Sequence, residues 1–267
     1  MLKKTTILFI LSFLAVNYSS LEASSAGRKV LVVMSYEQDF IWVKEMKQGI
    51  EEALPDDSTI KYIYLETREN IAGGKEKAKE AWELYKTFAP DGVIAADDNA
   101  QSMFVVPYLK DKVNIPVMFC GVDAKPEKYG YPASNVSGIL QRIHTLETLI
   151  FLKQLIPGVE KVGFMVKKGP TGAAWIEQIK KDTVNSPVKV IEYRTPTIMP
   201  EALEMVKEMR ETCDALFIGA MQRIRDHNGE PLEDDVALPM LTRAFGKPVF
   251  SNTRFRVRYG ALCAVVD

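Results

Sequence analysis

The chain alternates apolar, β-branched segments with segments of helical periodicity, and this alternation constrains the fold more than any other feature. Between the apolar segments, residues 42–53 and 78–88 carry apolar side chains at steps of three or four. Strands that alternate with helices form parallel sheets, because each helix returns the chain to the same end of the sheet. The strands predicted in the first half are residues 29–35, 59–66, 92–96 and 115–120.

The same order of elements recurs in the second half. Strands are predicted at residues 161–166, 188–194, 215–220 and 247–252, with helices near 173–184 and 200–211. The likeness is clearest between AWELYKTFAPDGVIAAD and ALEMVKEMRETCDALFIGA, which both read as helix, short turn and apolar strand. We therefore predict an α/β protein of two doubly wound parallel-sheet lobes joined by a hinge.

The lobe boundaries follow from this pattern. The predicted N-terminal lobe is residues 27–138 and the predicted C-terminal lobe is residues 139–251, with a crossover in the segment 134–142. Residues 252–267 are predicted to form a return hinge and a last strand.

Residues 1–26 have the features of a signal peptide. Lys3 and Lys4 precede an apolar run at 7–16, and small residues suit cleavage after Ala23 or Ala26. The run is shorter than the roughly 20 residues of a membrane-spanning helix, and no Cys follows it to carry a lipid. We predict a periplasmic or otherwise extracytoplasmic protein. Cleavage would remove two lysines and one glutamate and change the net charge from −1 to −2, which indicates neither nucleic acid nor an anionic membrane as a partner.

The remaining composition gives no sign of catalysis. The three cysteines lie far apart without C-x-x-C spacing, so we expect free, inert thiols. His144 and His227 have no further His or Cys at zinc-ligand spacing, and no Ser–His or Cys–His combination indicates a nucleophile. The run AGGKE at 72–76 lacks the first Gly and the Ser or Thr of a P-loop. We predict no enzyme activity, no cofactor and no metal.

Polar residues and glycines follow the predicted strands in both halves. Ligands bind at the carboxyl ends of parallel strands, because helix N-termini and free loop amides converge there. Two such edges that face each other form a cleft. The predicted ligand contacts are Ser35, Tyr36, Trp42, Asp97, Asp98, Asn99, Gly121, Val122, Thr171, Gly172, Gly219, Ala220, Ser251 and Asn252.

Two adjacent carboxylates end the third strand and leave two interpretations open. Side chains of neighbouring residues on an extended chain point to opposite sides, so Asp97 and Asp98 cannot act as a carboxylate pair. Asp98 or Asn99 either caps the helix that begins near Ala100 or contacts the ligand, and one residue can do both. If the ligand carries an ammonium group, Asp98 is the expected partner through a charge-assisted hydrogen bond.

The other predicted contacts also have alternatives. The loop KKGPTG at 167–172 is either an anion-binding loop before a helix or an ordinary turn. Ser35, Thr171 and Ser251 are the expected partners of a ligand carboxylate. Tyr36 directly follows the first strand and is the better candidate for an aromatic contact, whereas Trp42 either lines the cleft or packs in the core.

Four segments carry a resemblance to a known family: VLVVMSYEQDFIWVKEMKQGIEEAL, PDGVIAADDNA, IPVMFCGVDAKPEKYGYPASNVSGIL and LKQLIPGVEKVGFM. Together they resemble the exported solute-binding proteins of ABC importers with the type I periplasmic-binding-protein fold, in the branch that includes aromatic amino acid binders. The resemblance covers nearly all of residues 28–266. It implies a ligand held between the lobes by the strand-end loops, including Ser35, Tyr36, Asp98, Asn99, Gly121, Thr171 and Ser251.

The C-terminal end of the chain departs from that family, and related modules have a second function. The chain stops at the apolar segment 260–267, whereas family members continue with another helix and further strands, so we expect a second lobe that is truncated at its C-terminus. Similar modules also serve as the extracytoplasmic sensing parts of membrane kinases.

The function predicted from the sequence is capture of a small polar solute by closure of the two lobes. An amino acid is the expected solute, and an ABC permease of the inner membrane is the expected partner. The first alternative is a sensory module coupled to a membrane sensor kinase, and the second is an exported α/β enzyme.

Overall fold

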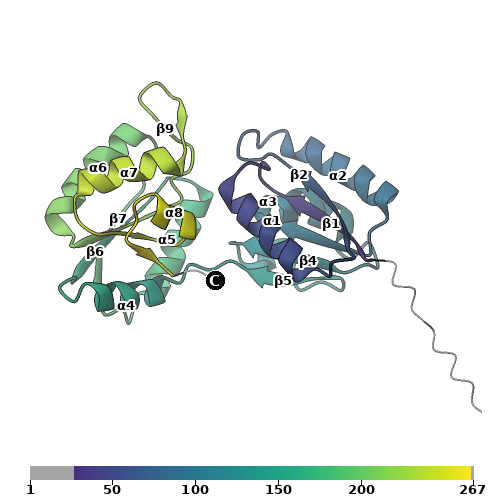
Figure 1. Ribbon diagram of the computed structural model, residues 1–267, viewed down its shortest axis with the longest axis horizontal. Coiled ribbons are helices and arrows are strands. Elements are labelled where there is room, and N and C mark those ends of the chain that lie inside the picture. Colours follow the sequence, from purple (N-terminus) through teal and green to yellow (C-terminus); the bar gives the residue numbers. More distant parts are fainter. Residues whose placement is uncertain (1–26, 266–267) are drawn as a thin grey trace, which may run out of the picture.

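The computed structural model describes residues 27–265, which form two lobes (Figure 1). The first lobe, purple to teal in Figure 1, is built on a five-stranded parallel sheet in the order β2-β1-β3-β4-β5. The four strands predicted for this lobe are confirmed, with ends that differ by no more than two residues. The strands are β1 (Lys29–Met34), β2 (Thr59–Tyr64), β3 (Gly92–Ala96), β4 (Val117–Val122) and β5 (Val136–Leu140).

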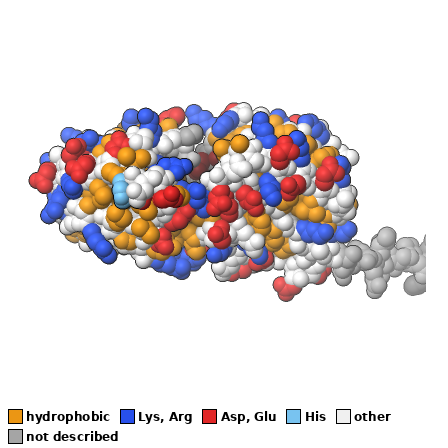
Figure 2. Space-filling view, turned by 90° about the horizontal axis from the view of Figure 1, so that it is seen from above, with side chains coloured by type: hydrophobic (Ala, Val, Ile, Leu, Met, Phe, Trp, Pro, Cys, Tyr) orange, Lys and Arg blue, Asp and Glu red, His pale blue; other side chains and the backbone are white. Residues whose placement is uncertain are grey.

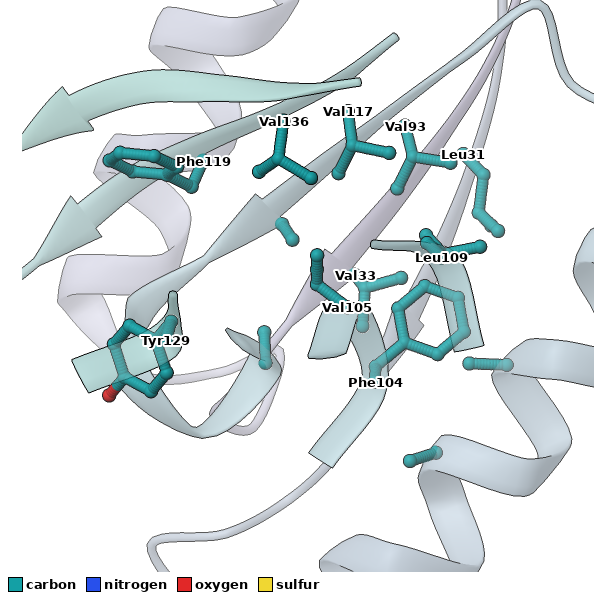
Figure 3. Close-up of a cluster of buried hydrophobic side chains, with 14 of the residues drawn as sticks. Leu31, Val33, Val93, Phe104, Val105, Leu109, Val117, Phe119, Tyr129 and Val136 are labelled. Atoms are coloured by element: carbon teal, nitrogen blue, oxygen red, sulfur yellow. The ribbon is translucent and has the colours of Figure 1, made fainter. Parts of the chain in front are cut away.

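Helices cover both faces of this sheet because its strands are apolar on both sides. In Figure 3, Leu31, Val93, Val117 and Val136 lie in a row across the sheet, and the side chains of one π-helical segment, η1, pack against them. The opposite face is covered by α1. The helices of this lobe are α1 (Ile41–Ala53), α2 (Gly74–Phe88), α3 (Asp97–Ala100), η1 (Gln101–Leu109) and the short 3₁₀ helix η2 (Pro126–Tyr129).

The second lobe, green to yellow in Figure 1, repeats the architecture of the first. Its five-stranded parallel sheet has the order β7-β6-β8-β11-β12, which matches the order of the first sheet strand by strand along the chain. This match is the structural counterpart of the repeat seen in the sequence. The strands are β6 (Lys161–Val166), β7 (Lys189–Arg194), β8 (Ala215–Gly219), β11 (Val249–Ser251) and β12 (Cys263–Ala264).

The helices of the second lobe include the two predicted for it. A small hairpin, β9 (Ile224–Arg225) with β10 (Pro231–Leu232), occupies the charged run between β8 and the next helix. The helices are α4 (Thr145–Leu155), α5 (Pro170–Asp182), α6 (Met199–Thr212), α7 (Asp234–Phe245) and α8 (Arg254–Arg258).

The segment 134–142, predicted as a crossover, is mostly a strand of the first sheet. β5 lies within it and pairs in parallel with β4, so the link to the second lobe begins after Leu140. Apolar alternation in VSGIL is as compatible with an edge strand as with a linker, which explains the error. The predicted boundary after residue 138 therefore falls inside β5.

Three further expectations concern the ends and the cysteines. Residues 1–26, the predicted signal peptide, lie outside the described residues, and within 27–265 no helix is long and apolar enough to cross a membrane. In the last segment, 260–267, the described strand is Cys263–Ala264 alone. Cys120, Cys213 and Cys263 are free.

Candidate functional site

A cavity of about 350 Å³ lies between the lobes, at the carboxyl ends of the strands of both sheets. The first lobe lines it with an acidic and aromatic surface, and the second lobe lines it with a more basic one. From the first lobe and the link come Tyr36, Phe40, Trp42, Arg68, Asp97, Asp123 and Gln141; from the second come Lys167, Lys168, Gly169, Thr171, Gly172, Trp175, Ala220, Gln222, Arg223, Thr253, Phe255 and Arg256.

Two carboxylates of the first lobe reach the cavity wall. Asp97 follows β3 with a left-handed backbone (φ 73°), and its side chain accepts a 2.6 Å hydrogen bond from Tyr36 Oη and a 3.2 Å bond from the backbone N–H of Asn99. Asp123 follows β4 and is partly buried. Within residues 27–265, neither carboxylate has a Lys or Arg nitrogen within 4.0 Å.

Burial of these carboxylates shifts their titration. Burial is the main reason that the pKa of Asp97 rises to about 7 and the pKa of Asp123 to about 6, and the negative charge of Asp98 adds to both shifts. Burial and the same carboxylates also raise the pKa of Tyr36. The acidic end of the cavity is therefore a place where negative charge is costly unless a cation enters.

The structure does not place Asp98, the expected partner of a ligand ammonium, on the cavity wall. Its carboxylate accepts hydrogen bonds from the backbone N–H groups of Asp123 (3.0 Å) and Ala124 (3.3 Å) and from Tyr129 Oη. It thus joins the end of β3 to the loop after β4. The sequence correctly predicts that the two aspartates diverge, but Asp97 is the one that faces the cavity.

The predicted helix capping by Asp98 or Asn99 is wrong. Ser35 Oγ accepts the 2.8 Å hydrogen bond from the Ala100 N–H and donates to the Ala96 carbonyl, so it acts as the cap from a neighbouring strand. The amide of Asn99 donates instead to Thr67 Oγ1 at 2.9 Å. Ser35 and Asn99 therefore support the strand ends and do not line the cavity.

Aromatic rings form one side of the cavity. Tyr36 lies edge-on to Phe40 and to Trp42, with ring centroids 5.9 and 5.7 Å apart. Tyr36 and Trp42 both line the cavity, as predicted for Tyr36 and as one of two alternatives for Trp42. Across the cleft, Trp175 of α5 and Phe255 of α8 complete the aromatic surface, and neither was predicted.

The remaining predicted contacts divide between the wall and the layer behind it. Thr171, Gly172 and Ala220 line the cavity. Five others lie behind the wall. Gly121 makes room for Trp42, Gly219 makes room for Trp175 and Phe217, and Val122 is buried in the core. Ser251 Oγ donates a hydrogen bond to the Ile218 carbonyl, and the side-chain oxygen of Asn252 accepts one from Arg256.

The two lobes also meet through ion pairs around the cavity. On the face shown in Figure 2, acidic and basic side chains lie beside one another where the lobes join. Arg68 of the first lobe pairs with Glu233 of the second (2.6 Å) and stacks on the ring of Phe40 (3.8 Å). Beside the link, Arg254 of the second lobe pairs with Glu45 of the first (3.0 Å). The lobes are thus held together at the cavity rim and near the hinge.

Comparison with known proteins identifies the fold. No protein-family model matches the chain, and no curated protein matches its sequence. An ABC domain from Streptococcus pneumoniae, solved with L-Trp, is similar over 90% of this chain and 79% of its own, with a TM-score of 0.58 and 19% identity. The chain has the fold of the type I periplasmic-binding proteins.

Two further structures with this fold are similar to the chain. One is a ligand-free, open substrate-binding protein with adhesive properties from Clostridium difficile (TM-score 0.63, 16% identity, 88% of this chain and 77% of that chain). The other is an ABC transporter solute-binding protein from a Bradyrhizobium species with bound Bis-Tris (TM-score 0.56, 14% identity, 85% and 66%). These two neighbours are binding proteins.

The cavity of this type I periplasmic-binding-protein fold offers chemistry for binding. Its wall carries carboxylates, cations and rings, and within residues 27–265 no group of three His, Cys, Asp or Glu side chains is arranged to hold a metal. The arrangement suits a ligand of mixed charge with an apolar body.

Proposed function

We propose that this chain is an exported solute-binding protein that captures an amino acid between its lobes and delivers it to an ABC permease. The observation that carries the proposal is the pair Asp97 and Asp123 on the wall of an inter-lobe cavity, next to Tyr36 and Trp42. Among residues 27–265, neither has a Lys or Arg nitrogen within 4.0 Å.

Both carboxylates are costly to keep charged in the ligand-free protein. Burying a carboxylate without a counter-charge costs several kcal/mol of free energy, and far more at a dielectric constant of about 4. The carboxylate responds by taking up a proton. A ligand ammonium group between Asp97 and Asp123 would supply the missing charge and hydrogen-bond donors. The affinity would then come from contacts that exist only when the lobes close on the ligand.

The aromatic surface limits the shape of the solute. Tyr36 and Trp42 on one lobe and Trp175 on the other present ring faces or edges to the same space. Such rings bind both an apolar side chain and an ammonium group, the latter through cation–π attraction. An α-amino acid with an apolar or aromatic side chain has both parts.

Import is supported by the fold and by the neighbours with this architecture, several of which are solute-binding proteins of ABC transporters. Export is supported by the features of residues 1–26. A permease gene and an ATPase gene beside the gene of this chain would favour import over the sensing alternative, and a kinase gene there would favour sensing.

Binding is tested with the twenty common L-amino acids, first by thermal shift and then by calorimetry. We expect at least one to bind, and we expect Asp123→Asn to weaken its affinity about tenfold or more, since a hydrogen bond to a charged group contributes roughly 1.5–3 kcal/mol. Asp56→Asn is the matched control, because Asp56 is exposed on the same lobe.

Two results would count against the proposal. If no amino acid binds the unaltered protein, the solute class is wrong. If an amino acid binds equally well to Asp123→Asn and Asp56→Asn, the acidic end of the cavity is not where its ammonium group lies.

A further inference from the structure

Lys167 is a cation on the cavity wall without a carboxylate of its own. It directly follows β6, and its ammonium group donates a hydrogen bond to the backbone carbonyl of Gln222. Within residues 27–265, no Asp or Glu oxygen lies within 4.0 Å of its Nζ, although its side chain is partly buried.

The two arginines near it are already paired. Arg68 contacts Glu37 (3.8 Å) and Glu233 (2.6 Å), and Arg223 contacts Glu69 and Glu233 (3.8 and 3.7 Å).

Deeper in the second lobe, Arg256 Nε donates to Asp234 at 2.9 Å. The neighbouring carboxylates are therefore oriented toward arginines. Lys167 is left facing the cavity with only a neutral acceptor.

Its surroundings disfavour an unpaired positive charge. Burial lowers the pKa of Lys167, and the positive charges of Arg68 and Arg223 add to this shift, although the negative charges of Asp234 and Glu233 oppose it. An anion that entered the cavity beside this ammonium group would relieve both effects.

Two independent features add hydrogen-bond donors to the cavity wall. Helix α5 begins three residues after Lys167, its N-cap residue Gly169 provides no side-chain cap, and Thr171 and Gly172 of its first turn line the cavity. Gly172 allows this close approach, because a Cβ there would lie 2.3 Å from the Lys167 carbonyl oxygen. Separately, Arg256 is 1% exposed, lines the cavity, and has an Nη2 group without a hydrogen-bond partner in the described chain.

We propose that Lys167, with the first turn of α5, binds the carboxylate of the solute whose ammonium group lies at Asp97 and Asp123. This inference rests on the proposed function and narrows the solute to zwitterions: free amino acids bind more tightly than their amides and the corresponding amines. It replaces two of the three hydroxyls predicted for this role, because Ser35 and Ser251 donate to backbone carbonyls inside their own lobes.

The experiment compares each L-amino acid with its α-carboxamide by calorimetry at pH 7.5. The amide keeps the side chain and lacks the negative charge. Its α-amino group, with a pKa of roughly 7.7–8.0, is only about two-thirds protonated at pH 7.5, so its affinity is corrected for the protonated fraction. In the unaltered protein we expect the free acid to bind at least about tenfold more tightly, given roughly 1.5–3 kcal/mol for a charged hydrogen bond. In Lys167→Met this preference should fall to less than about threefold, and Lys167→Arg should retain part of it.

The control is Lys207→Met, since Lys207 is an exposed lysine of α6 that pairs with Glu204. It should keep the full preference. The unaltered protein tests the inference without any variant: equal binding of acid and amide would overturn it, even if a variant fails to fold. A preference that survives in Lys167→Met would overturn the role of Lys167 while leaving amino acid binding intact. Binding of no amino acid at all would reject the proposed function, which is a different result.

Discussion

The ion pair between Arg68 and Glu233 predicts how closure of the lobes depends on charge. Arg68 belongs to the first lobe and Glu233 to the second, and their 2.6 Å contact lies at the rim of the cavity. Any opening that separates the rims breaks this contact. The pair therefore contributes to the free energy of the closed state and not to that of the open state.

The size of the effect follows from exposure. Two unit charges about 4 Å apart interact by roughly 4 kcal/mol at an effective dielectric constant of about 20. The Arg68 side chain is 13% exposed but the Glu233 side chain is 46% exposed, so water and salt reduce this value toward that of a surface pair, about 1 kcal/mol. We expect Glu233→Gln to disfavour closure by about 1 kcal/mol, which is roughly fivefold in ligand affinity.

Calorimetry with the amino acid that binds best measures this affinity, and small-angle X-ray scattering of the ligand-free protein reports the radius of gyration. The variants are Arg68→Gln, Glu233→Gln and the double variant, whose coupling energy isolates the pair. Arg254→Gln is the matched control. It removes an inter-lobe ion pair with Glu45 that lies beside the link, next to Asn252 and Thr253, where opening moves the lobes least.

We expect the ligand affinity to fall about fivefold in Glu233→Gln and less than about twofold in Arg254→Gln. In the unaltered protein, the affinity should fall as NaCl is raised from about 0.05 to 0.5 M. Equal losses of affinity in Glu233→Gln and Arg254→Gln would show that the affinity depends on the net charge of the protein and not on closure of the lobes. An unchanged affinity and radius of gyration in Glu233→Gln would refute the reasoning entirely.

Two further predictions concern stability. Burial raises the pKa of Asp97 to about 7 and of Asp123 to about 6, so the native state holds protons that the unfolded chain, with a carboxyl pKa of roughly 3.9, has already released. The contribution of each carboxyl to the free energy of unfolding should therefore fall as pH rises from about 4 to 7, by at most about 1.4 kcal/mol per pH unit. Carboxyls whose pKa is lowered, such as Glu192 and Asp214, act in the opposite direction, so the test is the difference between the unaltered protein and Asp97→Asn in urea denaturation at each pH. The free energy of unfolding of the unaltered protein, relative to that of the variant, should fall over this range, and a rise would contradict the sign. In the same urea denaturation, Gly121→Ala should lower the free energy of unfolding by about 1–3 kcal/mol, because its φ of +64° disfavours a side chain and its new Cβ would lie 2.7 Å from Trp42. Gly49→Ala, in α1 with no atom within 4 Å of the new Cβ, should raise it by up to about 1 kcal/mol.

Most of the fold was predictable because it depends on local pattern. Strands such as Gly92–Ala96 and Lys161–Val166 are buried on both faces, so they appear in the sequence as unbroken apolar runs between turn residues. The repeat was visible because both halves place the same elements in the same order. The edge strand Val136–Leu140 was misassigned, because an exposed edge has a weaker pattern than a central strand.

The sequence predicts which loops form the site but not which residues of each loop line the cavity. The rule that ligands bind there indicated the correct loops, and six of the fourteen predicted residues line the cavity. The choice within each loop depends on tertiary contacts. Ser35 and Ser251 were reasonable candidates for binding a ligand carboxylate, yet their hydroxyls donate hydrogen bonds to backbone carbonyls. Arg68 lies two residues after the predicted strand 59–66, and Lys167 and Asp123 directly follow β6 and β4, so the same rule could have included all three.

The stretch VIAADDNA ends a buried strand in two carboxylates because each has a different task. Asp98 accepts hydrogen bonds from two backbone N–H groups and from Tyr129 Oη, and these bonds hold the loop that carries Asp123. Asp97, turned by its left-handed backbone, reaches the cavity and meets Tyr36. One carboxylate is satisfied by the protein and stays within the lobe, and the other is only partly satisfied and faces the cleft. A strand end with both carboxylates satisfied would leave the cleft without attraction for a cation, and one with both unsatisfied would burden the folded lobe with two unpaired buried charges. Dividing the roles between adjacent residues, which must point apart, lets the same short segment build the lobe and prepare it for a ligand.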